Sequence, residues 1–149
     1  MKVKAFLDTN ILLDLIQIGR PCAPYSREIM QSVYDGDMEA VITTQSIIDT
    51  SYTAQKAGIT QSFLDTVKLW CTYVNVDPVD AFDVRFAIKD YTGDFEDDAQ
   101  YYRALDACCD VIVTSDESFR KKYNGKNEHL KLMSPQEFVS KMKPAAKQS

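Results

Sequence analysis

One stretch near the N-terminus decides the fold class, and it reads Val3-Lys4-Ala5-Phe6-Leu7-Asp8-Thr9-Asn10-Ile11-Leu12. Residues 3–7 form a short, largely apolar run with β-forming side chains, which predicts a strand. Apolar residues then recur at helical spacing over residues 10–18, which predicts a helix. A strand that leads directly into a helix, with an aspartate at the junction, is how an α/β unit begins.

The same alternation of strand and helix continues along the chain. The later strands are predicted where short apolar runs stand between helical patterns, over residues 40–43, 73–76, 111–114 and 130–133. The clearest of them is Val111-Ile112-Val113-Thr114, which is followed by Ser115 and Asp116. The pattern predicts a three-layer α/β/α fold with a central, mostly parallel sheet.

Capping residues set the predicted helix starts. We expect Ser26, Ser46 and Thr60 to be N-caps, because each stands just before a helical apolar pattern. Asp77-Pro78 is typical of a cap and first turn. Ser134-Pro135-Gln136-Glu137 is a capping box that predicts a terminal helix through Met142.

Length and composition bound the class of protein. The chain has 149 residues, of which 45% are hydrophobic and 26% charged, so it is not intrinsically disordered. We expect one domain over residues 1–142 and a flexible tail over residues 143–149. No apolar run approaches the ~20 residues of a membrane span. Four cysteines without zinc-ligand spacing favour a cytoplasmic protein, and a single histidine excludes triad and multi-histidine zinc chemistry.

The charge balance limits the surfaces available for nucleic acid. There are 22 acids against 17 bases, a net charge of −5, which argues against a broad nucleic-acid-binding surface. The concentrated basic stretch is Arg120, Lys121, Lys122 and Lys126. It is compatible both with a solvated face and with a contact to RNA phosphate.

Acidic residues fall at the predicted ends of strands. Asp8 follows the first strand, Asp116 lies two residues beyond residue 114, and Asp97 opens the helix that leads into that strand. Asp49 lies in the helix after the second strand. Ligands of parallel sheets bind at the carboxyl ends of strands, so these side chains can converge. A ligand set made only of oxygen atoms favours Mg²⁺ or Mn²⁺.

Each of these acids also has a structural interpretation. Asp8 and Asp116 suit helix caps, and Asp49 stands where it would complete a capping box with Ser46. Asp97 belongs to Asp94-Phe95-Glu96-Asp97-Asp98, whose acids favour a helix N-terminus. A shift of one residue in that helix would exchange Asp97 and Asp98.

Four stretches, taken in order, resemble the motifs of PIN domains. The first is Leu7-Asp8-Thr9-Asn10-Ile11-Leu12-Leu13-Asp14, and the second is the helical region from Thr43 to Lys56. The third is Asp94-Phe95-Glu96-Asp97 with Val111-Ile112-Val113-Thr114-Ser115-Asp116, and the last is Ser134-Pro135-Gln136-Glu137-Phe138. The resemblance covers nearly the whole chain.

The resemblance implies a metal-dependent ribonuclease like the VapC-type toxins of toxin–antitoxin pairs. It implies that Asp8, Asp97 and Asp116 hold Mg²⁺ or Mn²⁺, and that Asp49 matches a further acid, often Glu in the family. Thr114 matches a hydroxyl near the metal, and Asn10 a residue that orients the first aspartate. RNA, a small antitoxin protein and a second copy of the chain are the implied partners.

Two other functions are compatible with the residues. A catalytically inactive PIN-like module would use the acidic pocket to bind a cation, or a nucleic-acid or protein partner, without turnover. A metal-dependent phosphatase is a third alternative, although Asp8-Thr9-Asn10 lacks the second aspartate of the usual Asp-x-Asp phosphatase motif.

Overall fold

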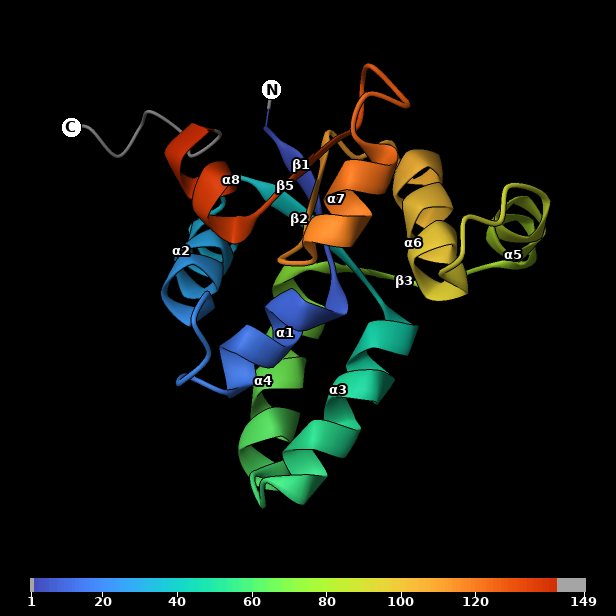
Figure 1. Ribbon diagram of the computed structural model, residues 1–149. Coiled ribbons are helices and arrows are strands. Elements are labelled where there is room, and N and C mark those ends of the chain that lie inside the picture. The colour runs from blue at the N-terminus through green and yellow to red at the C-terminus, as the bar shows by residue number, and fades with distance from the viewer. Residues whose placement is uncertain (1, 142–149) are drawn as a thin grey trace.

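The computed structural model describes residues 2–141, which fold into helices layered on a central sheet (Figure 1). The strands are β1 (Lys4–Leu7), β2 (Glu39–Thr43), β3 (Asn75–Asp77), β4 (Val111–Val113) and β5 (Lys131–Met133). The helices are α1 (Thr9–Ile16), α2 (Ala23–Tyr34), α3 (Thr44–Lys56), α4 (Thr60–Tyr73), α5 (Ala81–Lys89), α6 (Phe95–Asp106), α7 (Glu117–Tyr123) and α8 (Pro135–Lys141). All five predicted strands are present, with ends shifted by at most two residues.

The order of the strands places a topological switch point at the centre of the sheet. The order is β3-β2-β1-β4-β5, and every neighbouring pair is parallel. The chain moves outward from β1 to β2 and β3, and then returns to β4 on the other side of β1. Leu7 pairs with Val113 across this junction. The residues that follow the two strands, Asp8 and Thr114, therefore lie side by side where ligands of such sheets bind.

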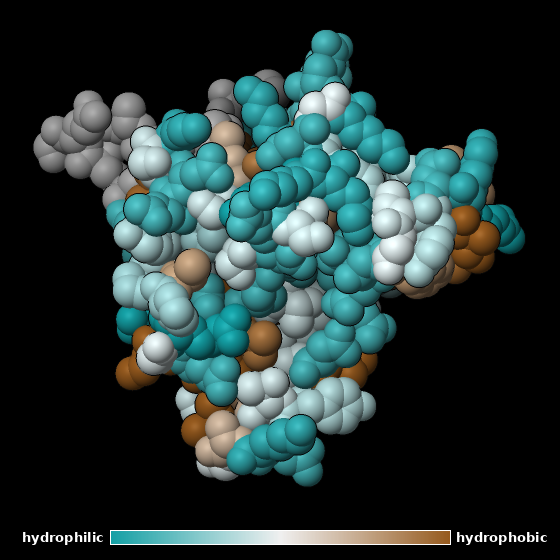
Figure 2. Space-filling view, viewed as in Figure 1, coloured by the Kyte–Doolittle hydropathy of each residue, from teal (hydrophilic) through white to brown (hydrophobic). Residues whose placement is uncertain are grey.

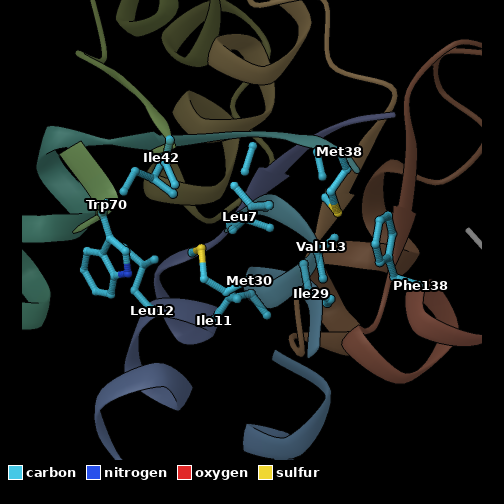
Figure 3. Close-up of a cluster of buried hydrophobic side chains, with 14 of the residues drawn as sticks. Leu7, Ile11, Leu12, Ile29, Met30, Met38, Ile42, Trp70, Val113 and Phe138 are labelled. Atoms are coloured by element: carbon cyan, nitrogen blue, oxygen red, sulfur yellow. The ribbon is translucent and has the colours of Figure 1, made fainter. Parts of the chain in front are cut away.

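The two faces of the sheet are covered by different helices. Because successive side chains of a strand alternate, Ala5 and Leu7 join a core cluster with helices α1, α2, α3, α4 and α8 (Figure 3). Phe6 points to the opposite face and packs in a second cluster with Tyr101 of α6 and Phe119 of α7. The predicted three layers are confirmed.

Helix α5 lies outside these layers. It packs against α6, away from the sheet (Figure 1). Its side chains Phe82, Phe86 and Ile88 are exposed, and a hydrophobic (brown) area lies at the right of the face shown in Figure 2, where this helix is.

Two predicted caps prove to be interior helix residues. Helix α2 begins at Ala23, and the buried hydroxyl of Ser26 donates a hydrogen bond to Asp14 at 2.6 Å. Helix α3 is capped by Thr43, whose Oγ1 accepts from the backbone N–H of Ser46 at 3.0 Å. Both serines lie one turn inside their helices because an earlier residue already supplies the start.

Two further helix starts are also wrong. Ile59, not Thr60, is the N-cap of α4 and offers no side-chain hydrogen bond. Helix α5 is opened by a capping box between Asp80 and Asp83, each side chain accepting from the other's backbone N–H at 3.0 Å, so the Asp77-Pro78 prediction is wrong. The capping box of Ser134 and Glu137 is confirmed, with hydrogen bonds of 3.1 and 3.3 Å.

The ends of the chain lie beyond what the structure describes. The final residue of the predicted terminal helix, Met142, and the predicted tail over residues 143–149 lie outside the described residues. The extent of the predicted domain, residues 1–142, stays a prediction. Within residues 2–141, no helix has both the length and the hydrophobicity needed to cross a membrane.

Candidate functional site

Asp8 stands at the centre of a hydrogen-bond network at the carboxyl end of β1. Its backbone N–H continues the sheet by donating to the carbonyl of Val113 at 3.1 Å. Its Oδ1 accepts from the backbone N–H of Thr9 at 2.7 Å and so caps α1. Its Oδ2 accepts from Asn10 Nδ2 at 3.0 Å and from Thr114 Oγ1 at 2.7 Å. Asp8 therefore both caps α1 and lies in the candidate site, because it stands between the end of β1 and the start of α1.

Asn10 and Thr114 join the ends of β1 and β4. Asn10 Nδ2 also donates to Thr114 Oγ1 at 3.2 Å, and Asn10 Oδ1 accepts from the backbone N–H of Ser115 at 3.3 Å. Thr114 is fully buried, and its Oγ1 accepts from the backbone N–H of Asp116 at 3.1 Å. The side chains of Asn10 and Thr114 thus fix the orientation of Asp8 and the start of the loop that carries Asp116.

Asp116 caps α7 and shares its surroundings with Asp8. Its Oδ1 accepts from the backbone N–H of Phe119 at 3.2 Å. Burial raises the pKa of Asp8, and the negative charge of Asp116 adds to this effect although hydrogen bonds oppose it. Two carboxylates at one place repel each other unless a cation lies between them.

Asp97 brings a third carboxylate to this place from the first turn of α6. The side chain is 8% exposed, and burial together with the charges of Asp94, Asp8 and Asp116 raises its pKa to about 7. The backbone N–H of Asp97 donates to Asp94 Oδ1 at 3.0 Å, which caps the helix. Lys122 opposes the increase in pKa. In Figure 1 the first turns of α1, α6 and α7 lie at the same edge of the sheet.

The structure distinguishes Asp97 from its neighbour Asp98. Asp98 is fully buried and accepts hydrogen bonds from Thr92 Oγ1 at 2.5 Å, from the backbone N–H of Thr92 at 2.9 Å and from the hydroxyl of Tyr123. Burial acts to raise the pKa of Asp98, but the Thr92 and Tyr123 hydrogen bonds outweigh it and lower the pKa. Asp98 therefore anchors the loop before α6, while Asp97 faces the other site acids.

Asp49 lies apart from these three acids. It is half-buried in the second turn of α3, and its Oδ1 accepts from Gln45 Nε2 at 3.1 Å. Since Thr43 caps the helix, the capping-box interpretation with Ser46 is wrong. The charge of Asp49 acts instead on Glu96, whose pKa is raised by burial, by Asp8 and by Asp49.

Two residues of this region were not among the sequence candidates for the site. Glu96 lies near both Asp8 and Asp49, and its Oε1 accepts from Gln100 Nε2 at 3.2 Å. Gln100 is 4% exposed and also acts on Asp8 through a hydrogen bond that lowers the pKa of Asp8. The spacing of Glu96 and Gln100, one helical turn apart, was the signal available in the sequence.

The side chains of the basic stretch (Arg120, Lys121, Lys122 and Lys126) make contacts with different parts of this chain. Arg120 Nη1 donates to the carbonyl of Thr114 at 2.8 Å, and Lys121 Nζ pairs with Glu117 at 2.9 Å. Lys126 Nζ lies over the ring of Tyr123, 5.1 Å from its centroid. The stretch is therefore not one continuous basic surface.

A second cluster of aspartates lies beside α5 and can be compared with the acids around Asp8. The oxygen atoms of Asp80, Asp83 and Asp106 lie within 4.8 Å of one another, a spacing that no other set of three His, Cys, Asp or Glu residues reaches in residues 2–141. Arg103 already occupies this cluster: Nη1 lies 3.2 Å from Asp80 and 3.5 Å from Asp83, and Nη2 pairs with Asp106. A cation is therefore not required there.

The donor set around Asp8 suits a hard divalent cation. It offers only oxygen ligands, and burial together with the charges of Asp94, Asp8 and Asp116 raises the pKa of Asp97, so a bound cation would favour its ionised form. The oxygen atoms stand wider apart than in the Arg103 cluster, which leaves room for water ligands.

The chain belongs to the PIN domain family, whose model matches residues 4–118. The match spans all the strand ends described above except that of β5. No protein of curated function matches the sequence.

Three solved structures with the same fold are a VapC toxin and two toxin–antitoxin complexes. Mycobacterium tuberculosis VapC20, a toxin that cleaves the sarcin–ricin loop, superposes with a TM-score of 0.65 and 14% identity over 79% of this chain and 94% of that chain. A toxin–antitoxin complex from Klebsiella pneumoniae superposes with a TM-score of 0.61 and 18% identity, over 88% of this chain and 97% of that chain. VapBC2 of Rickettsia felis, bound to a DNA fragment from its promoter, superposes with a TM-score of 0.59 and 13% identity, over 89% of this chain and 98% of that chain. These similarities confirm the PIN fold.

Proposed function

We propose that this protein is a Mg²⁺- or Mn²⁺-dependent endoribonuclease that hydrolyses RNA phosphodiester bonds. The observation that carries the proposal is the convergence of Asp8, Asp97 and Asp116 at the switch point, where residues 2–141 supply no ion pair comparable to that of Arg103. Family membership supports it, because PIN domains include the nuclease toxins named above.

Asp8, Asp97 and Asp116 would hold the metal, which when bound supplies a Lewis acid for the phosphate and lowers the pKa of a water molecule. Thr114 and Asn10 hold Asp8 by hydrogen bonds of 2.7 and 3.0 Å, so its carboxylate needs little rearrangement. Gln100 constrains Glu96 beside the same place. These residues position the acids and need not contact the substrate.

We also propose that the protein is the toxin of a toxin–antitoxin pair that acts in the cytoplasm. Two of the similar structures are complexes of such pairs, which supports a small antitoxin as partner. A homodimer is part of the same proposal.

The decisive experiment is cleavage of a labelled RNA pool with Mg²⁺, with Mn²⁺ and with EDTA. We expect cleavage only with metal, and a loss of about 100-fold or more in Asp8→Asn and Asp97→Asn, because each removes a carboxylate that would hold the metal. Asp106→Asn is the matched control, since it removes an exposed carboxylate from the Arg103 cluster, and we expect it to cleave like the wild type.

Equal products from the wild type and both site variants, with all proteins folded by circular dichroism, would contradict the nuclease proposal. Retained binding of Mn²⁺ or RNA without cleavage would instead favour a catalytically inactive PIN-like binding module.

A further inference from the structure

We propose that a cavity beside the acidic site is a subsite for a guanine base of the RNA, read by Asp49 and Gln45. This inference rests on the proposed ribonuclease function and adds a sequence preference to it. It also gives Asp49 a role different from that of the three acids around Asp8.

The cavity lies between the first turns of α3 and α6 and the segment that leads into α5. Its volume is ≈ 370 Å³, within the range of small-molecule sites. One part of its wall is apolar and comes from Val79, Val84, Phe95 and Ala99. The other part is polar and comes from Thr43, Gln45, Asp49, Glu96 and Gln100. A flat base with an apolar face and a polar edge suits this division.

Two residues of the cavity wall connect the cavity to the acidic site. Glu96 and Gln100 line the cavity, and both also interact with Asp8. A nucleotide whose phosphate lies beside Asp8 would therefore have its base within reach of this cavity. Phe95 is 43% exposed at its rim and offers a ring on which a base of single-stranded RNA can stack.

The polar wall matches the hydrogen-bonding edge of guanine. Asp49 Oδ1 accepts from Gln45 Nε2, while Oδ2 accepts no hydrogen bond from residues 2–141. The carboxylate can accept from N1–H and N2–H of guanine, and the second N–H of the Gln45 amide can donate to O6. Adenine would place its N1 acceptor against the carboxylate, and uracil and cytosine lack two adjacent donors. The edge therefore selects guanine.

Gln100 gives independent support for a ligand in this cavity. Its side chain is buried, and its Oε1 has no hydrogen-bond partner within residues 2–141. An acceptor left unpaired in this way costs stability. Because Gln100 lines the cavity, a small turn of its side chain would let a ligand that brings hydrogen-bond donors pair with this atom.

The first experiment maps the cleavage sites of the full chain on a random RNA pool with Mn²⁺. We expect cuts at one fixed position relative to guanine, preferred over adenine by about tenfold or more. Replacing guanosine by inosine, which lacks the 2-amino group, is expected to remove part of the preference. Asp49→Asn is expected to remove most of it, because the amide keeps one acceptor oxygen and presents an NH2 donor in place of the other.

Asp65→Asn is the matched control. Asp65 lies in α4 and accepts from Gln61 Nε2 at 3.1 Å, the same i to i+4 pair at the same distance as Gln45 and Asp49. It is not among the residues that line the cavity. We expect Asp65→Asn to keep the guanine preference of the wild type.

Binding separates a failure of this inference from a failure of the nuclease proposal. With Asp8→Asn, fluorescence anisotropy of RNA pentamers with a central guanine, inosine or adenine measures recognition without turnover, and guanine is expected to bind best. Metal-dependent cleavage without base preference would overturn the subsite and leave the nuclease standing. An Asp49→Asn variant that cuts equally slowly at every base would also overturn the subsite, since it would place Asp49 at the metal.

Discussion

Two clusters of aspartates in this molecule have similar composition and opposite electrostatics. At the switch point, Asp8, Asp97 and Asp116 face one another, and the pKa of Asp97 rises to about 7. Beside α5, Asp80, Asp83 and Asp106 stand closer together, but the Arg103 guanidinium lies among them. The second cluster holds α5 against α6. The comparison shows that proximity of acids alone does not indicate a metal site, because a buried guanidinium can already compensate their charge.

The largest effect is expected from removing the cation of the compensated cluster. Arg103→Met leaves the buried carboxylate of Asp83 without its partner, so we expect the free energy of unfolding to fall by about 2–4 kcal/mol. Urea unfolding measures this change. In an Asp8→Asn background, Mg²⁺ is expected to restore part of the loss by entering the vacated cluster.

Arg85→Met is the control for that substitution, because Arg85 contacts the exposed ring of Phe82 and no acid of the cluster. We expect it to change stability by less than about 1 kcal/mol. An Arg103→Met protein as stable as Arg85→Met would show that the two acidic clusters do not differ as described.

The uncompensated cluster is expected to respond to pH in the opposite sense to an ordinary ion pair. The pKa of Asp97 is raised from 3.8 to about 7, so the folded protein binds more protons than the unfolded chain between these values. Stability should therefore fall as pH rises from about 4 to 7. In EDTA at pH 8, Asp97→Asn should raise the free energy of unfolding by about 1–3 kcal/mol, with little change at pH 4.

Thermal unfolding from pH 4 to pH 8 checks this prediction, and excess Mg²⁺ should reduce the difference at pH 8. Parallel curves for the wild type and Asp97→Asn would mean that the carboxylate of Asp97 is not repelled by its neighbours.

Much of the fold could be predicted because the strands and helices have clear periodicity. The five strands were located to within two residues, and the junction after β1 was correct. The helix starts at Ser26 and Ser46 were wrong because each helix begins one turn earlier, after Cys22 and after Thr43. Burial of Ser26 against Asp14 is a tertiary contact that local sequence does not encode.

The candidate site was predictable where a side chain follows a strand directly. Asp8 and Thr114 meet because β1 and β4 are neighbours, an order of strands that the structure supplies and the sequence pattern does not. The choice between Asp97 and Asp98 required the position of Tyr123, a residue 25 positions away along the chain. Glu96 and Gln100 were missed because their role depends on how α6 is rotated toward Asp8.

The smallest effect is expected from Lys122, the cation that lowers the pKa of Asp97. Lys122→Gln removes a half-buried positive charge near the site acids, so Mn²⁺ should bind about twofold to threefold more tightly and the pKa of Asp97 should increase. Isothermal titration with Mn²⁺ at low ionic strength measures the change, and the difference should shrink as salt is added. Lys121→Gln is the matched control, because Lys121 pairs with Glu117 on the exposed side of α7 and should leave the affinity for Mn²⁺ as it is. Equal effects of the two substitutions would mean that Lys122 acts only through the net charge of the protein, and that the site acids around Asp8 have no local basic neighbour at all.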